Sequence, residues 1–389
     1  MRELQPGLES ETLAAPGALW TSREIAQQPA MLRQTRFLLE EVRPDIDRIL
    51  KPLLSRPDLK MILTGAGSSA FIGECLAPWL ASVLPCYVEA IASTDIVSAP
   101  RLYLRRQTPT LLVSFARSGN SPESVAAARF TDRFVAEAHH LVITCNPQGA
   151  LAAHARSVPG SLLLLLPEAT HDKSFAMTSS LSCMTYAALG AFSKAATSPS
   201  RIEAIARATE AVIEHHDALL RQIAGCGYER VVYLGSHIFR GLAQEAALKL
   251  LELTDGSCVA AFDSPLGFRH GPKTIVNQRT LVVLFLSNDP GTRPYDLDLL
   301  EELKRDGLTK RLLVISAQDD VALAGLNHIR VPCLEDAGDV DLIFPYVVVP
   351  QLLALHSSLH YNLSPDNPNR TGTVNRVVKG VRIHPPVDS

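Results

Sequence analysis

The sequence predicts an α/β protein made of two domains, each a parallel sheet flanked by helices. The chain has 389 residues, of which 47% are hydrophobic, so it can bury more core than one ordinary domain. Apolar runs of strand length alternate with longer segments of helical periodicity, and strands this apolar are covered on both faces, as in parallel sheets. The two halves also resemble each other, which indicates a tandem duplication.

Seven apolar runs have the length of buried strands. In chain order they are 61–63, 110–115, 140–144, 161–166, 231–234, 281–286 and 312–315. Each half therefore has about four predicted parallel strands separated by helices. Each half also ends in a predicted apolar helix, over 175–192 in the first half and over 343–361 in the second.

The duplication places the domain boundaries. "MILTGAG" opens one half as "VVYLGSH" opens the other, "LVITCNPQGALAAHARSVP" resembles "LLVISAQDDVALAGLNHIRVP", and matched positions stay about 170 residues apart. We expect an N-terminal helical segment, two domains and a C-terminal tail, over residues 1–45, 46–198, 199–365 and 366–389.

Composition narrows the choice of partners. A net charge of -3 and a pI near 6.5 give no general attraction to nucleic acids or acidic membranes. The first residues lack an apolar signal segment, and the longest apolar run, 342–355, contains two prolines and is shorter than the roughly 20 residues of a membrane span. The seven cysteines stand singly, which favours reduced thiols over disulfides or a zinc site. We expect a cytoplasmic protein that binds a small molecule and no metal.

The loop after the first predicted strand resembles a dinucleotide fingerprint. Gly65-x-Gly67-x-x-Ala70 follows an apolar run, and Glu89 closes the next run at about the right distance. The equivalent loop of the second half, "GSHIF", lacks the glycine pattern, and a lone motif of this kind has many false matches. A nicotinamide cofactor is therefore the less favoured alternative, and we expect no cofactor.

Hydroxyl-rich loops favour a smaller phosphate site. "SFARSGNSPES" follows a predicted strand and opens a predicted helix with Ser121 as N-cap, Pro122 at the first position and Glu123 in the first turn. The free amides of this helix, with the hydroxyls of Ser118 and Ser121, would form a compact anion site. The loop "GSS" at 67–69 and the patch "HDKSFAMTSS" follow two other strands, so all three are expected at the carboxyl edge of the sheet. The alternative is that each loop only caps its helix. The residues expected to contact a phosphomonoester or the molecule that carries it are Gly67, Ser68, Ser69, Arg117, Ser118, Gly119, Asn120, Ser121, Lys173, Ser174 and Thr178.

Three ionisable residues share one face of a predicted helix. "GLAQEAALKLLELTDG" is rich in alanine and leucine, which predicts packing on more than one side, yet it places Glu245, Lys249 and Glu252 at i, i+4 and i+7. The stripe is either a solvated row of ion pairs or a catalytic row. The next segment, "AAFDSPLGFRHGPKTIV", is too irregular to predict a helix or strand. It carries His270, which either caps or packs the loop or forms an acid/base pair with the carboxylates.

Together these motifs resemble a known family. "GAGSS", "SFARSGNSPES", "HDKSFAMTSS", "EAALKLLELTDG" and "RHGPKTIV" are similar to the sugar isomerase (SIS) domains that occur in tandem in the isomerase half of glucosamine-6-phosphate synthase. "TSREIAQQPAMLRQT" and "AAFDSPLGFRHGPKTIV" resemble most closely the branch of tagatose-6-phosphate ketose/aldose isomerase or galactosamine-6-phosphate deaminase. The resemblance runs from about Thr21 to the C-terminus. It implies two tandem SIS domains with a flavodoxin-like three-layer fold, in a homo-oligomer, at least a dimer, with shared active sites.

The resemblance also implies phosphate-binding residues. Ser69, Ser118 and Ser121 match the family's phosphate-binding hydroxyls. Arg117 stands where the synthase has glutamine, so the phosphate contacts are expected to differ from those of the synthase.

Catalytic residues follow from the same resemblance. Glu252 matches the carboxylate that moves a proton between C1 and C2 of the sugar, and Glu245 and Lys249 line the same face. His270 matches the ring-opening histidine, which in the synthase reaches into the neighbouring subunit's site. Lys379, in "NRVVKGV", matches the tail lysine that covers the sugar.

The implied reaction depends on the source of ammonia. The synthase carries an ammonia-supplying domain that this sequence lacks, so we expect the deaminating direction. An amino-sugar 6-phosphate, D-galactosamine 6-phosphate, would give tagatose 6-phosphate and ammonia by acid/base catalysis that requires neither metal nor nicotinamide. The alternatives are a plain ketose/aldose isomerase, a glucosamine-6-phosphate deaminase, a regulator that binds a sugar phosphate without turnover, and a nicotinamide dehydrogenase.

Overall fold

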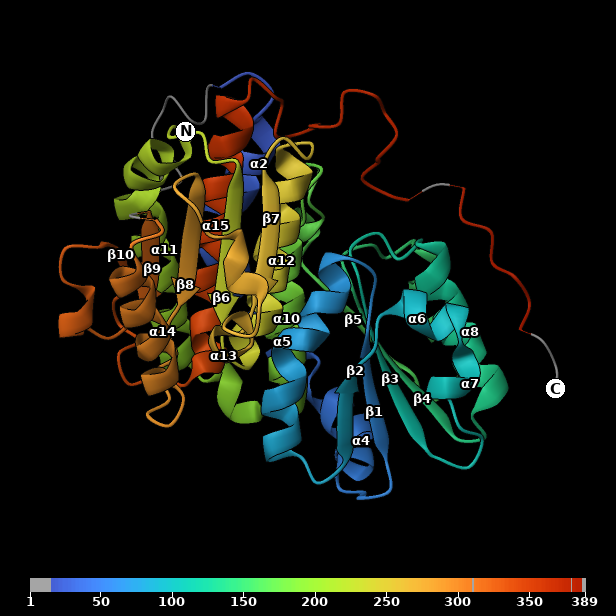
Figure 1. Cartoon of the computed structure of the whole chain (residues 1–389). Helices are drawn as coiled ribbons and strands as arrows, with labels where there is room; N and C mark the ends of the chain where they lie inside the picture. Colours follow the sequence, from blue (N-terminus) through green and yellow to red (C-terminus); the bar gives the residue numbers. More distant parts are fainter. Residues whose placement is uncertain (1–14, 310, 379, 387–389) are drawn as a thin grey trace, which may run out of the picture. The chain divides into compact units, whose positions relative to one another are not determined.

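Figure 1 shows a computed structural model of the chain, which describes residues 15–309, 311–378 and 380–386. The chain divides into two compact units, each built on one five-stranded sheet. The first-sheet unit consists of the described residues of 31–172, 179–199 and 374–389, and the second-sheet unit of those of 1–30, 173–178 and 200–373. All strands in both sheets are parallel, so the predicted α/β fold is confirmed.

The first sheet has the strand order β2-β1-β3-β4-β5, which is the flavodoxin-like order. Its strands are β1 (Lys60–Thr64), β2 (Tyr87–Ala90), β3 (Thr110–Ala116), β4 (Ala138–Thr144) and β5 (Leu162–Leu165). One face packs against α6 (Ser93–Ser98), α8 (Pro122–Phe134) and α9 (Ala150–Ser157). The other contacts α4 (Arg43–Leu54), α5 (Ser68–Val83) and α10 (Ser179–Phe192). Every residue of β3 is buried, because both faces of this central strand are covered.

The second sheet repeats this order as β10-β9-β8-β6-β7. Its strands are β6 (Arg230–Gly235), β7 (Val259–Asp263), β8 (Thr280–Phe285), β9 (Leu312–Ser316) and β10 (Asn327–Arg330). The remaining described α-helices are α2 (Leu19–Ala26), α3 (Gln28–Glu41), α7 (Pro100–Tyr103), α11 (Pro199–Ala224), α12 (Ile238–Leu253), α13 (Pro265–Phe268), α14 (Arg293–Asp306) and α15 (Asp339–His360). The prediction of two equivalent parallel sheets is confirmed, and the exact domain boundaries stay a prediction.

The duplication extends to the backbone of single residues. Gly67, before α5, adopts φ 56° and ψ -131°, and its counterpart His237, before α12, adopts φ 49° and ψ -113°. A Cβ on Gly65 or on Gly235 would lie about as close to the following helix, 2.6 Å from a Ser69 backbone atom and 2.6 Å from a Phe239 backbone atom. The same tight turn from strand to helix is therefore built twice.

Three strands were not predicted. β2, β7 and β10 lie at sheet edges, where one side has no neighbouring strand, and they contain exposed or partly exposed residues. Their sequences therefore lack the continuous apolar runs that identify central strands. The expectation that the segment around 260–276 forms no element is wrong, since it contains part of β7, α13 and the 3-10 turn Pro272–Ile275.

Helix α15 is the core helix of the second-sheet unit. It runs without a break through Pro345 and Pro350, so the apolar helix predicted over 343–361 is confirmed. Among the described residues, α15 alone has the length and hydropathy of a membrane span, with a mean hydropathy of 1.5 in its most apolar window. Since 94% of that window is buried in the protein and α15 packs on α12, its apolar composition is explained by the core.

Candidate active site

The first loop of the first sheet joins β1 to α5. Gly67 turns the chain at positive φ, and Gly65 leaves room for the backbone of Ser69. Ser68 and Ser69, in the first turn of α5, are buried. The amino end of α5 therefore places hydroxyls and backbone amides at the carboxyl edge of the sheet.

The second loop joins β3 to α8 and carries the predicted phosphate motif. Ser121 is the N-cap, a proline opens the helix and Glu123 lies in the first turn, as predicted. The Ser121 hydroxyl donates to Glu123 Oε2 at 2.9 Å and does not cap a first-turn amide. The Ser118 hydroxyl accepts from the Asn120 amide at 3.3 Å. The amino end of α8 thus lacks a side-chain cap, which is the state in which such amides bind anions.

Two of the predicted phosphate contacts shape this loop. Asn120 Oδ1 accepts from the Ala150 amide at 2.9 Å, at the start of α9. Gly119 adopts φ 67°, and a Cβ there would come within 3.3 Å of Gly149 Cα. Asn120 and Gly119 therefore have a structural role, and their contact with phosphate stays a prediction.

Two arginines bring positive charge to the same loop. Arg117 is only 7% exposed, and its Nη2 donates to the Arg376 carbonyl at 3.0 Å. The Arg376 guanidinium in turn donates to the Asp172 carbonyl. Burial, together with the positive charges of Arg376 and Arg117, lowers the pKa of His171. The carboxyl edge of the first sheet therefore has a local positive field that suits a phosphate dianion.

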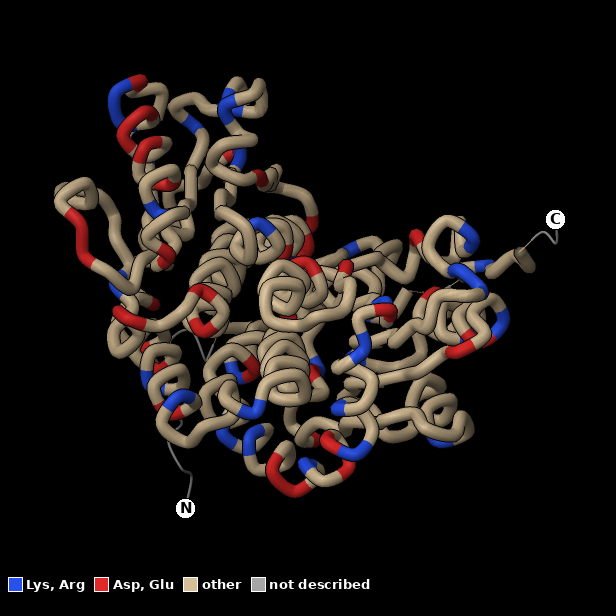
Figure 2. The backbone as a smooth tube through the Cα atoms, turned by 90° about the horizontal axis from the view of Figure 1, so that it is seen from below, with Lys and Arg blue, Asp and Glu red and all other residues tan. Residues whose placement is uncertain are grey.

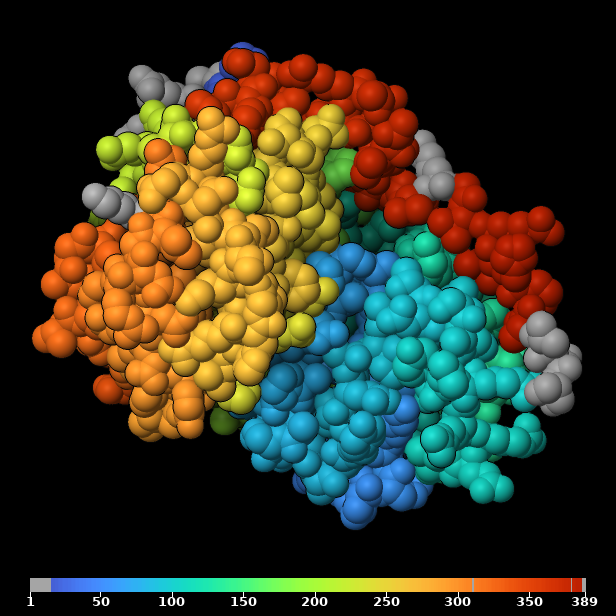
Figure 3. Space-filling model, in the orientation of Figure 1, coloured from blue at the N-terminus to red at the C-terminus, as the bar shows by residue number. Residues whose placement is uncertain are grey.

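Sequence reasoning missed Arg376, which lies three positions before the tail lysine that was predicted. The segment that carries it belongs to the first-sheet unit from Val374 onward. In Figures 1 and 3 this segment, coloured red, runs over the surface beside the helices of that unit, where residues 381–386 line a pocket with α6 and α7. Lys379 itself lies outside the described residues.

The corresponding loops of the second sheet hold carboxylates of the chain itself. After β8, the Ser287 hydroxyl and the Asn288 amide donate to the two oxygens of Asp339, at 2.5 and 2.7 Å. After β6, the Ser236 hydroxyl donates to Asp296 Oδ1 at 2.5 Å, and the Ser287 amide donates to Asp296 Oδ2 at 3.0 Å. Burial raises the pKa of Asp296 to about 6 and also raises that of Asp339. The donors at this edge are therefore already bound to internal carboxyl groups.

The ionisable stripe on α12 is buried. The side chains of Glu245 and Lys249 are each 1% exposed, whereas that of Glu252 is 23% exposed. Lys249 Nζ lies 3.5 Å from Glu245 Oε1 and forms an ion pair with Glu252. The alternative of a solvated stripe is wrong, because the side chains of two of its three members are buried. What remains is a buried lysine that holds one carboxylate at the surface.

His270 lies at the end of α13. The side chain is exposed, and it makes no hydrogen bond or ion pair with the part of the chain that the structure describes. Its neighbours Arg269 and Lys273 both pair with Glu302. Within the second-sheet unit, His270 is therefore not hydrogen-bonded to Glu252.

The third predicted patch, 171–180, is divided between the units: 173–178 belong to the second-sheet unit, and 171–172 and 179–180 belong to the first-sheet unit. Glu24 of α2 accepts from the backbone amides of Lys173 and Ser174, and Lys173 Nζ lies 4.1 Å from the centre of the Trp20 ring. Ser174 and Thr178 are buried. The patch is thus fixed to α2, and its convergence with the loops of the first sheet stays a prediction.

One group among the described residues has the composition of a metal site. Asp132, His140 and His154 bring their ligand atoms within 4.8 Å of one another. His140 Nε2 lies 2.7 Å from Asp132 Oδ1, which is a hydrogen-bond distance, and His154 Nε2 lies 3.2 Å from Oδ2. A carboxylate shared by two imidazoles explains this geometry without an ion.

Comparison with known proteins places the chain in a family. Residues 53–193 match the SIS domain model. The chain is 48% identical to an AgaS relative from Streptomyces coelicolor, over 94% of this chain and 96% of that one. The chain belongs to the AgaS family of SIS-domain proteins. This confirms the predicted SIS membership and the two-domain α/β architecture that it implied.

One solved structure and one more distant relative are also similar to this chain. One similar solved structure is the crystal structure of tagatose-6-phosphate ketose/aldose isomerase from Escherichia coli, which is 41% identical to this AgaS-family chain with a TM-score of 0.90. The match covers 98% of this chain and 99% of the Escherichia coli chain. Glutamine--fructose-6-phosphate aminotransferase (isomerizing) from Bradyrhizobium diazoefficiens is 25% identical over 89% of this chain. This chain spans 57% of that enzyme's length.

Proposed function

We propose that this AgaS-family protein is an enzyme that converts D-galactosamine 6-phosphate into tagatose 6-phosphate and ammonia. The observation that carries the proposal is the buried stripe on α12, in which Lys249 holds Glu252 as the one carboxylate that reaches the surface. The substrate comes from relatives, since a Shewanella protein 45% identical over 97% of this chain is named D-galactosamine-6-phosphate deaminase AgaS.

The phosphate is held at the carboxyl edge of the first sheet. The hydroxyls of Ser69, Ser118 and Ser121 and the amides at the start of α8 donate to its oxygens, and the α8 dipole favours its negative charge. Arg117 adds a charge-assisted hydrogen bond, and Arg376 strengthens the local positive field. Ser68, Gly67, Gly119 and Asn120 keep the two loops in shape.

The proton transfer is assigned to Glu252. Once the sugar ring is open, the Glu252 carboxylate removes the proton from C2 while O1 takes up a proton, which gives an enolamine. Glu252 then returns its proton to C1 while the amine nitrogen loses one. The product of this step is a ketimine at C2 with a hydroxymethyl group at C1. Water then adds to the ketimine carbon and ammonia leaves, which yields the ketose 6-phosphate. The reaction is therefore an isomerisation followed by a hydrolysis.

Lys249 and Glu245 position the base. Lys249 forms an ion pair with Glu252 and lies 3.5 Å from Glu245, so the two buried residues fix the direction of the catalytic carboxylate. The segment around Lys173, Ser174 and Thr178 is assigned to sugar binding, and Lys379 to covering the bound sugar.

His270 is assigned to ring opening in the active site of a second copy of the chain. Its side chain is exposed and has no hydrogen-bonding partner among the described residues of its own chain, which suits a group donated to a neighbour. This assignment requires a homodimer. We also assign the protein to the cytoplasm. Mixing Glu252→Gln chains with His270→Asn chains tests the assignment of His270, because a mixed dimer has one intact site only if His270 acts across the interface. Ammonia release that stays at the level of the separate variants would contradict it.

The second candidate is a ketose/aldose isomerase that releases no ammonia. It is favoured by the 41% identical Escherichia coli structure described by that activity. Ammonia release from galactosamine 6-phosphate, glucosamine 6-phosphate and a sugar phosphate without nitrogen distinguishes the two. The proposal expects ammonia from the first compound at the highest kcat/KM. Isomerisation of galactose 6-phosphate without ammonia release from either amino sugar would overturn it.

A further inference from the structure

We propose that the first-sheet unit has a second anion site, for a small molecule that carries two or more linked phosphate groups. The site is a pocket of about 510 Å³ lined by Arg101, Leu104, Arg105, Arg106, Arg133 and Phe134. This volume lies in the range of ordinary small-molecule sites. The proposal does not depend on the deaminase reaction.

The charge of the lining is the first support. Four of the six lining residues are arginines, and no carboxylate lines the pocket. Over the rest of the chain both signs of charge are interspersed (Figure 2), which makes a lining whose charged residues are all arginines unusual for this protein. Repulsion among guanidinium groups in one pocket is relieved by a bound polyanion.

The nearby carboxylates are engaged elsewhere. Asp132, beside Arg133, is shared by two histidines. Asp58 and Glu137 both pair with Arg56. Arg105 and Arg106 make no side-chain hydrogen bond or ion pair with any described residue. The positive charges of Arg105 and Arg106 are therefore not neutralised by side chains of the described residues.

Helix capping explains only part of this arrangement. α8 ends at Phe134, so Arg133 lies in its last turn, where a cation stabilises a helix by about 0.3–1 kcal/mol. Arg105 and Arg106 lie outside any helix. Arg101 likewise lies in the last turn of the short helix α7, so Arg105 and Arg106 are the two arginines left without a structural explanation of this kind.

The pocket is also preorganised. The Phe134 ring lies 5.6 Å from Arg101 Cζ and 5.4 Å from Arg133 Cζ, so one aromatic surface holds two of the guanidinium groups. The backbone that carries the other two is anchored, since the Ala136 amide donates to the Arg106 carbonyl at 2.9 Å. Leu104 is buried beneath them. The four arginines are exposed, and several guanidinium forks around one pocket favour adjacent phosphate groups over a single phosphate.

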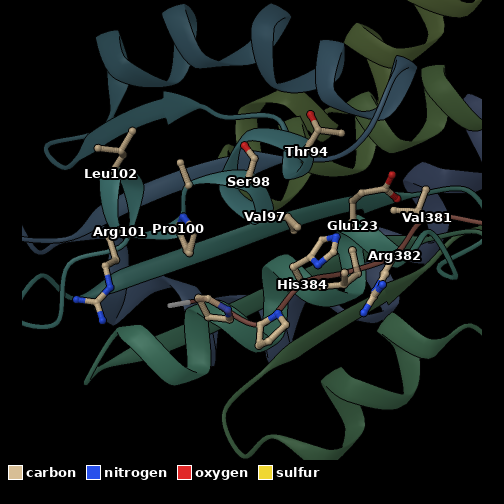
Figure 4. Close-up of a pocket in the computed structure, with 14 residues that line it drawn as sticks. Thr94, Val97, Ser98, Pro100, Arg101, Leu102, Glu123, Val381, Arg382 and His384 are labelled. Atoms are coloured by element: carbon tan, nitrogen blue, oxygen red, sulfur yellow. The ribbon is translucent and has the colours of Figure 1, made fainter. Parts of the chain in front are cut away.

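The site is distinct from the proposed catalytic loops. It lies at the end of α8, whereas Ser118 and Ser121 lie before the start of this 13-residue helix, which is roughly 20 Å long. Arg101 also lines a neighbouring pocket of about 600 Å³, where Figure 4 shows Val97, Leu102 and His384 around it. A ligand whose phosphate groups bind the arginines could therefore place its remaining part in this neighbouring pocket, whose lining is mostly uncharged.

Isothermal titration with inorganic pyrophosphate, without divalent metal, tests the site. The wild type should bind pyrophosphate at least about tenfold more tightly than monophosphate, since two phosphate groups engage separate arginines. In the double variant Arg105→Ala/Arg106→Ala, Kd for pyrophosphate should rise at least about tenfold. Arg129→Ala is the matched control, because Arg129 is an exposed arginine of α8 outside the pocket, and its Kd should stay within about twofold of wild type.

Further variants separate this site from the catalytic loops. Ser121→Ala should leave pyrophosphate binding unchanged, and Arg101→Ala should weaken it by about threefold or more. ATP in place of pyrophosphate shows whether a nucleoside adds affinity. Pyrophosphate binding that disappears in Ser121→Ala and persists in the double arginine variant would overturn the proposal. So would equal affinity for monophosphate and pyrophosphate in the wild type, or absence of binding in a wild type that releases ammonia normally.

Discussion

Replacement of Asp296 by asparagine tests whether burial raises the pKa of this carboxyl group, which binds the loops of the second sheet. The side chain is fully buried, and burial raises its pKa to about 6 from an ordinary 3.8, despite the hydrogen bonds from Ser236 and Ser287. Because the folded-state pKa lies above the unfolded value, the folded protein binds this proton more tightly. The stability that the protonated group contributes is therefore present at low pH and is lost as the pH rises through about 6.

The expected magnitude follows from the two pKa values. A shift of about two units corresponds to about 3 kcal/mol over the whole titration. From pH 7 to pH 5 the folded group becomes mostly protonated while the unfolded group stays mostly ionised. Over that interval the free energy of unfolding of the wild type should rise by about 1.4 kcal/mol relative to Asp296→Asn. Groups that titrate in both proteins cancel in this difference.

Urea unfolding at pH 7, 6 and 5 measures the difference, with the slope on denaturant compared between the two proteins. Asp298→Asn is the control, because Asp298 is an exposed residue of the same helix and its replacement removes a carboxyl group without changing the buried one. A difference for Asp296→Asn that is constant with pH, or that falls toward pH 5, would refute the reasoning from burial.

Three other predictions concern the proposed active site and the repeated turn. Glu252→Gln should lower kcat for ammonia release by about 10²–10⁴-fold with little change in KM, and steady-state kinetics that retain more than about a tenth of turnover would exclude it as the base. Arg117→Met should raise KM by about 10–100-fold, because a hydrogen bond from a charged donor contributes about 1.5–3 kcal/mol, and an unchanged KM would place the phosphate elsewhere. Gly235→Ala should destabilise the protein by more than about 2 kcal/mol, since the new Cβ would meet Phe239, and an unfolding midpoint equal to wild type would contradict this.

The central strands and the duplication were predictable, because both are determined by local pattern. β1, β3, β4, β6, β8 and β9 are apolar on both faces, and a parallel sheet covered by helices requires that composition. The edge strands β2, β7 and β10 carry weaker patterns, whereas β5, the remaining edge strand, was predicted because its four residues are all leucine. The formation of β2, β7 and β10 depends on the neighbouring strand and is not visible in their own residues.

Local chemistry predicted the Ser121 cap position, and long-range chemistry was missed. The hydrogen bond of Arg376 to the Asp172 carbonyl joins positions 204 residues apart, and no periodicity or turn signal marks such a contact. Asn120 shows how a predicted contact is taken up by the fold. Its side chain could bind phosphate, but its oxygen accepts a hydrogen bond from the backbone at the start of α9. Residue type defines candidates for a site, and the packing of neighbouring loops decides which of them remain available.

The carboxylates of Asp339 and Asp296 have a thermodynamic consequence for the duplicated fold. These two carboxylates are part of the chain, so they occupy the donors of the second sheet's loops at every substrate concentration. The donors in the loops of the first sheet instead bind solvent or a ligand that diffuses in. Ligand binding stabilises only the state that gains the ligand. Sugar phosphate should therefore slow hydrogen exchange around Ser118 and Ser121 and leave the amides of Ser287 and Asn288 at their unliganded rates.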